Sequence, residues 1–225
     1  MRLGCLPFLL FAVLLALLPL LFIEVLTTAM AKLRLTPQVA LLVVLGIIVG
    51  SVINIPVSRI RREEEFVVDP VAALFGLPSF APLFQRRYRE TIIAVNVGGC
   101  VIPSLVAVYE IGQLLAAVPH VVGMLLLAVT LNVFVCYKMA MPIPNIGIAM
   151  PAFVPPLVAV IAALLLTPDE APAVAFVAGV LGPLIGADLL HLRDIPHIAT
   201  GMASIGGAGT FDGIVLSGVL AAYLA

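Results

Sequence analysis

Long stretches of apolar residues dominate the chain, and short polar segments separate them. An apolar stretch of about 20 residues is long enough to cross a hydrocarbon core of roughly 30 Å as a helix. The alternating pattern typical of membrane strands is not seen in these stretches. The sequence therefore predicts an all-α fold, a polytopic membrane bundle of about seven transmembrane helices, with approximate limits 3–28, 37–56, 91–118, 121–137, 147–167, 171–190 and 207–224.

The composition agrees with this pattern and excludes several classes of protein. Of 225 residues, 63% are hydrophobic and 10% are charged. So few charged residues do not cover the surface of a water-soluble domain of this size. We therefore expect a single integral membrane domain over residues 1–225, which contacts the lipid bilayer and does not bind nucleic acid.

The longest connection between predicted helices covers about residues 57–90. Charged residues gather at its two ends, and its apolar middle is interrupted by Pro70, Pro78 and Pro82. The middle is too short and too interrupted to span a bilayer. An interfacial or re-entrant segment on the cytoplasmic side is the expected structure.

The basic residues predict which way the helices face. With seven spans, one side of the membrane receives only Lys32 and Arg34, and the other side receives Arg2, Arg59, Arg61, Arg62, Arg86, Arg87, Arg89, Lys138 and Arg193. Cytoplasmic connections are rich in lysine and arginine. The prediction is a multi-pass protein of the cell membrane with a cytoplasmic N-terminus and an extracytoplasmic C-terminus.

Four acidic residues fall inside predicted spans, where an ionisable group costs about 2.5 to 3.5 kcal/mol. Glu24 and Glu110 lie near the outer ends of their helices, so each can reach the interface or pair with Lys32 or Arg34. Asp188 and Asp212 are expected at a similar shallow depth on two consecutive antiparallel helices. The second pair therefore forms the candidate site.

Glycines surround both aspartates and predict an irregular backbone at the start of the last helix. Gly207, Gly209 and Gly213 stand beside Asp212, and a run of glycine can unwind a membrane helix to line a polar cavity. Asparagines are expected at the same side of the membrane, and these are Asn54, Asn96, Asn132 and Asn145. Together they predict a polar cavity that is open to the cytoplasm.

Two neighbouring carboxyl groups share one proton, which allows one to activate water while the other polarises a carbonyl group. Asp188 and Asp212 are therefore the candidate catalytic residues of an aspartyl peptidase. Gly207, Gly209, Gly213, Asn96 and Asn132 are candidate substrate-binding residues. A transmembrane helical peptide is the substrate that this reading implies.

The segments 184–190 and 203–213, which contain Ala187-Asp188 and Gly209-Thr210-Phe211-Asp212, resemble an uncharacterised prokaryotic membrane family known as a domain of unknown function. The topology also resembles presenilin and signal peptide peptidase, which are intramembrane aspartyl proteases. That class has one aspartate on its sixth helix, another on its seventh, and a Pro-Ala-Leu element. Pro151-Ala152-Phe153 resembles this element, and the resemblance implies that these three residues contact substrate.

Other functions fit the same residues. A proton- or cation-coupled transporter of a small solute would bind its ion at Asp188 and Asp212. A metal site would use Asp188 with His191, or Asp194 with His197, which are spaced three residues apart. In a scaffold, the aspartates would only join two helices. We expect neither a metal nor another cofactor, and the sequence leaves open whether the protein is an enzyme.

Overall fold

The computed structural model describes residues 5–61, 90–143, 147–198 and 201–225, which form a mostly helical fold with two small sheets. The all-α prediction is therefore wrong in one respect, because sheet is present. The elements that carry the description are α1 (Cys5–Lys32), α2 (Pro37–Gly50), β1 (Asn54–Arg61), β2 (Glu90–Asn96), η2 (Val97–Val101), α4 (Ile102–Ala117), α5 (Val122–Met139), β3 (Met141–Ile143), β4 (Gly147–Ala149), α6 (Val154–Leu166), α7 (Ala171–Leu181), η5 (Gly182–Leu189), α8 (Ile195–Ile198), β5 (Met202–Ile205) and α9 (Gly213–Leu224).

Three helical stretches in the described residues are long and apolar enough to cross a membrane: Val97–Ala117, Pro119–Met139 and Pro168–Asp194. Three shorter apolar helices, α2, α6 and α9, accompany them. These features are compatible with an integral membrane protein. They do not establish the predicted bundle of seven transmembrane helices.

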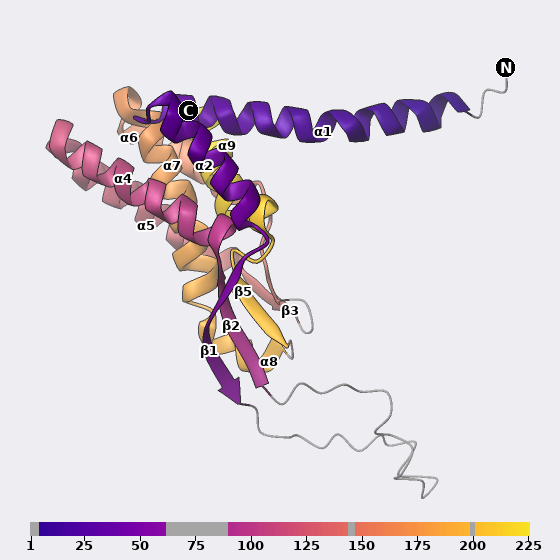
Figure 1. Ribbon diagram of the computed structural model, residues 1–225. Helices are drawn as coiled ribbons and strands as arrows, with labels where there is room; N and C mark the ends of the chain where they lie inside the picture. The colour runs from indigo at the N-terminus through magenta and orange to yellow at the C-terminus, as the bar shows by residue number, and fades with distance from the viewer. Residues whose placement is uncertain (1–4, 62–89, 144–146, 199–200) are drawn as a thin grey trace, which may run out of the picture.

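Strands occupy parts of the chain where the apolar pattern predicts helix. Strand β1 pairs with β2 in antiparallel fashion, and β2 pairs with β5 in parallel. The last residues of the predicted helix 37–56 therefore belong to β1, and the first residues of the predicted helix 91–118 belong to β2. Figure 1 shows this sheet at one end of the helical bundle. Of the predicted loop 57–90, residues 57–61 and Glu90 belong to the sheet, and 62–89 lie outside the described residues.

Helix α7 forms the centre of the bundle, and its residues Ala173 to Val180 are all buried. It packs against α4, α5, α6 and α9. Helix α1 is different, because it extends beyond the other helices (Figure 1), and the first buried residue among its described side chains is Leu26. Glu24 lies before this point and is exposed.

Two segments adjoin α-helices and are themselves π-helices, a wider helical form that is often found at functional sites. The first is η2, which leads from β2 into α4. The second is η5, which follows α7 and carries Asp188. Gly182 lies against the Asn132 side chain, whose Nδ2 donates to the Ala178 carbonyl oxygen over 2.8 Å. The second π-helix is therefore anchored to α5.

In the described part of the chain, basic residues lie at both ends of the bundle. Lys32 and Arg34 lie at one end, where Lys32 Nζ donates to the Tyr223 carbonyl oxygen at 2.6 Å. Arg59 lies in β1 at the sheet end, Lys138 lies near the end of α5, and Arg193 lies in the short 3-10 turn Leu192–Asp194 that follows η5.

Candidate functional site

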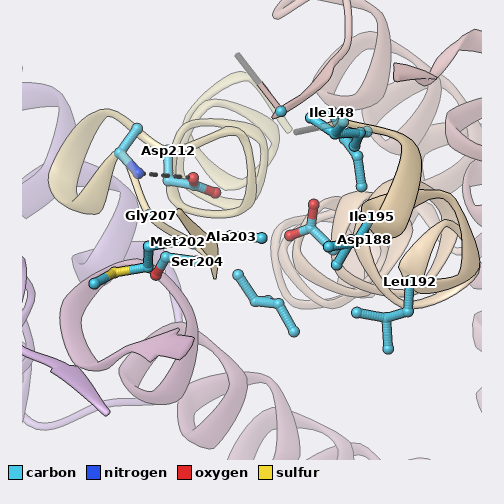
Figure 2. Close-up of a pocket in the computed structure, with 14 residues that line it drawn as sticks. Ile148, Asp188, Leu192, Ile195, Met202, Ala203, Ser204, Gly207 and Asp212 are labelled. Carbon is cyan, nitrogen blue, oxygen red and sulfur yellow. Dashed lines mark hydrogen bonds between the residues drawn. The ribbon is translucent and has the colours of Figure 1, made fainter. Parts of the chain in front are cut away.

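A cavity of about 380 Å³ lies at the sheet end of the bundle. Its walls come from β4, from the end of η5, from the segment 192–198, and from the continuous stretch 202–208 that begins with β5. Asp188 and Asp212 both line this cavity. Figure 2 shows their carboxyl groups on different sides of it. The fold thus brings together two acidic side chains that are 24 residues apart in the sequence.

Asp212 is held by the backbone around it. It is the N-cap of α9, and its Oδ1 accepts a hydrogen bond from Ile214 N at 2.9 Å. Its Oδ2 accepts from Ala208 N at 3.3 Å. Burial raises the pKa of Asp212 above its ordinary value, and the two N–H donors act in the opposite direction. These donors also fix the direction in which the carboxyl group points.

Asp188 lies near the end of η5 and is half-buried. The backbone N–H of Gly206 interacts with its carboxyl group. Within the described residues, no hydrogen bond joins Asp188 to Asp212. The two carboxyl groups line the cavity from different sides (Figure 2), each held by its own backbone contacts.

The loop between β5 and α9 depends on glycine. Gly206 and Gly209 have φ values of 70° and 62°, in the left-handed region where other residues are strained. The loop packs on the end of α2, where Ser51 Oγ lies 2.5 Å from Thr210 Oγ1. It also packs on η2, where a Cβ on Gly99 would overlap the Gly206 carbonyl oxygen. The irregular start of the last helix is thereby confirmed.

Of the glycines and asparagines that the sequence predicts to bind substrate, some line the cavity and others have a structural role. Gly207 lines the cavity, whereas Gly209 in the loop and Gly213 at the start of α9 do not line it. Asn96 is fully buried and structural: its Nδ2 donates to the Ser51 carbonyl oxygen at 2.8 Å, and its Oδ1 accepts from Gly99 N at 2.7 Å. Asn132 is equally buried and bonds to α7.

The segment with the Pro-Ala-Leu resemblance lies between β4 and α6. Pro151, Ala152 and Phe153 are exposed, and none of them lines the cavity. Their neighbour Ile148 does line it. Asn54 lies in β1 and accepts a hydrogen bond from Ser204 Oγ at 2.6 Å, and Asn145 lies outside the described residues.

The apolar wall of the cavity was not predicted. It includes Ile148, Leu192, Ile195 and Ile198. The signal in the sequence for the strand beside this wall is segment 202–205, which has the length of a short strand and stands between Gly201 and Gly206.

The metal hypothesis receives no support from the geometry. His191 is buried, and its Nδ1 lies 3.1 Å from the Gly186 carbonyl oxygen. It does not line the cavity with Asp188. Among the residues that the structure describes, no three His, Cys, Asp or Glu side chains gather as a metal site. Nothing is described of the His197 side chain.

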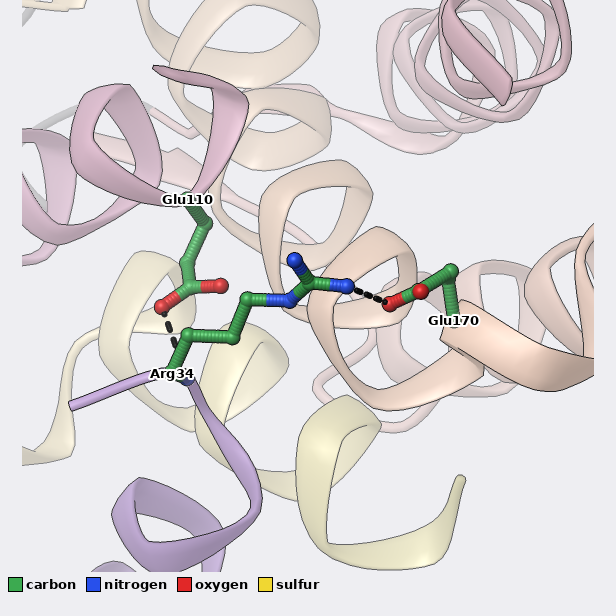
Figure 3. A network of polar contacts seen from close by, with 3 residues as sticks. All are labelled: Arg34, Glu110 and Glu170. Carbon is green, nitrogen blue, oxygen red and sulfur yellow. Dashed lines mark hydrogen bonds and ion pairs between the residues drawn. The ribbon is translucent and has the colours of Figure 1, made fainter. Parts of the chain in front are cut away.

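A second acidic site lies at the opposite end of the bundle. Glu110 is fully buried, and its Oε1 accepts from Arg34 N at 3.2 Å. The Arg34 guanidinium forms an ion pair with Glu170 at 2.5 Å (Figure 3). Glu110 thus contacts Arg34 through the backbone N–H, whereas the Arg34 guanidinium pairs with Glu170. In the described part of the chain, Glu110 Oε2 has no hydrogen-bond partner.

The apolar helices suggest association with a membrane, and two acidic side chains line one pocket of the helical fold. The chain belongs to the family described as Protein of unknown function (DUF1614), whose model matches residues 48–224. The predicted membership of an uncharacterised family is confirmed. A search of curated proteins and a search of solved structures each gave no match, so neither supports the resemblance to presenilin and signal peptide peptidase.

Proposed function

We propose that the protein is a membrane-embedded peptidase of the aspartic type, with Asp188 and Asp212 as its catalytic residues. The observation that carries this proposal is that both carboxyl groups face one cavity from separate elements. Among the residues that the structure describes, no lysine or arginine lines this cavity. Aspartic peptidases need only two carboxyl groups and a water molecule.

The hydrogen bonds assign the two roles. Asp212 accepts from two backbone N–H groups, which favour its ionised form, so it is the base. Asp188 carries the shared proton and donates it to the carbonyl oxygen of the scissile bond. Water then attacks the carbonyl carbon and gives one proton to Asp212. When the C–N bond breaks, that proton passes to the leaving nitrogen and Asp188 regains its own.

The charge distribution supports a multi-pass arrangement with the cavity on the cytoplasmic side. Arg59, Lys138 and Arg193 occur at the sheet end, where the cavity lies. Cytoplasmic segments are rich in such residues. A peptide entering from the inner leaflet would reach the two carboxyl groups directly.

The test uses purified protein in lipid vesicles without any ion gradient. The substrate is a synthetic transmembrane helical peptide. It carries a fluorophore and a quencher that flank the cytoplasmic end of its helix. We expect cleavage, followed by mass spectrometry of the products. A panel of such peptides that remains intact would contradict the proposal.

A proton-coupled transporter is the second candidate, and Glu110 is the observation that favours it. Its buried carboxyl group, with one oxygen unpaired among the described residues, lies at the end of the bundle opposite Asp188 and Asp212. Acidic groups at both ends are what a proton pathway across the membrane requires.

If the protein conducts protons, Glu110→Gln should reduce proton entry to the level of empty vesicles, because glutamine cannot take up a proton. A pH-sensitive dye inside vesicles with an imposed potassium potential measures this flux. Glu24→Gln is the matched control, because Glu24 is exposed on α1. Equal flux in both variants and the parent protein would reject this candidate.

A further inference from the structure

Strand β5 has an unused edge that faces the cavity. The sheet order is β1-β2-β5, and in the described part of the chain no strand pairs with the far side of β5. Ile92 N donates to the Gly201 carbonyl oxygen at 3.1 Å, which sets the register of the parallel pair. Groups on a parallel strand alternate in direction. The N–H groups of Met202 and Ser204 therefore point away from β2.

Strand β4 also has an unused edge. It pairs with β3 so that Pro142 lies opposite Ile148. Proline has no N–H, so this pair cannot be a hydrogen-bonded one. The N–H and carbonyl groups of Ile148 consequently point away from β3. Within the described residues, β4 has no other strand as a neighbour.

Both edges belong to the same cavity. Ile148 of β4 and residues 202–205 of β5 line it, and Figure 2 shows Ile148 on the other side from Met202 and Ser204. Leu192 and Ile195 line the same cavity and give it an apolar wall. An unpaired strand edge binds extended chains through backbone hydrogen bonds.

We propose that an extended, apolar peptide segment binds in this cavity as an added strand between β5 and β4, which joins the two small sheets into one. The backbone groups of Met202 and Ile148 and the N–H of Ser204 pair with the peptide, because the Ser204 carbonyl oxygen already accepts from Gly207 N, and the apolar wall contacts its side chains. The inference rests on the proposed function for the fate of the peptide, because an added strand passes its backbone carbonyl groups beside Asp188 and Asp212. Peptide binding can be measured separately from cleavage.

The first test compares Met202→Pro with Met202→Ala in an Asp188→Asn background, which prevents cleavage. Both substitutions remove the side chain, but only proline removes the N–H that faces the cavity. The probe is a labelled eight-residue peptide of alternating valine and threonine with blocked ends. Fluorescence anisotropy in detergent should show binding about tenfold weaker for proline than for alanine.

The same comparison applies to the second edge. Ile148→Pro should weaken binding about tenfold relative to Ile148→Ala, since it removes the outward N–H of β4. With Met202 and Ile148 both left unchanged, a peptide N-methylated at alternate residues should bind at least about tenfold more weakly than the unmethylated peptide, because methylation removes its backbone N–H donors. This second measurement does not depend on whether the proline variants fold.

The outcomes separate the two proposals. Equal binding of the N-methylated and parent peptides, or proline variants that match their alanine controls, would overturn the strand insertion. Loss at β5 without loss at β4 would also overturn it, since the peptide would then use one edge only. Edge-dependent binding without cleavage would leave the insertion in place and reject the peptidase.

Discussion

Asp188→Asn should abolish peptide cleavage, with a rate at least about a thousandfold below that of the parent protein. Asparagine has the size of aspartate and its side-chain oxygen can still accept from Gly206 N, but it cannot donate an acidic proton to the scissile carbonyl group. Asp212→Asn should have the same effect. Asparagine is also a good N-cap, so the start of α9 should be preserved.

The measurement pairs cleavage with thermal unfolding in the same detergent. If the two aspartates are a catalytic pair, each variant should lose cleavage while its unfolding midpoint changes little. If the aspartates only join η5 to α9, both variants should instead unfold at lower temperature. Asp194→Asn is the matched control, because Asp194 lies in the same region and does not line the cavity. Retained cleavage in the Asp188 variant would refute the catalytic role.

The apolar pattern predicted the helical character of the chain but not its strands. Residues 91–96 are as apolar as the helix that follows them, so a window of about 20 residues merges β2 with η2 and α4. A buried strand of this kind has no alternation that could reveal it. Its strand form depends on pairing with β1 and β5, which are distant in sequence.

Depth along the helices was sufficient to expect the two aspartates at one end of the bundle. Asp188 near a helix end and Asp212 near the next helix start must lie at the same end of the bundle, and both line one cavity. The roles of the asparagines could not be obtained in this way. Asn96 and Asn132 are polar and buried, but they bond to backbone groups of α2, η2 and α7, and these contacts depend on tertiary packing.

Gly99→Ala should destabilise the fold severely, by about 3 kcal/mol or more. A Cβ at this position would overlap the Gly206 carbonyl oxygen, and both partners are backbone. Relief requires the loop at Gly206 to move away from η2. The same loop directs the Gly206 N–H at Asp188 and leads to Asp212, so the variant should also lose cleavage.

Gly112→Ala is the matched control for this prediction. Gly112 lies in α4, and a Cβ there meets no atom within 4 Å. Alanine favours helix over glycine by roughly 0.5 to 1 kcal/mol, so this variant should be as stable as the parent protein or more stable. Thermal unfolding followed by circular dichroism compares the two. If the Gly99 variant unfolded at the same temperature as the Gly112 control, the contact between η2 and the glycine loop would be loose. The position of the Asp188 and Asp212 carboxyl groups would then need another support.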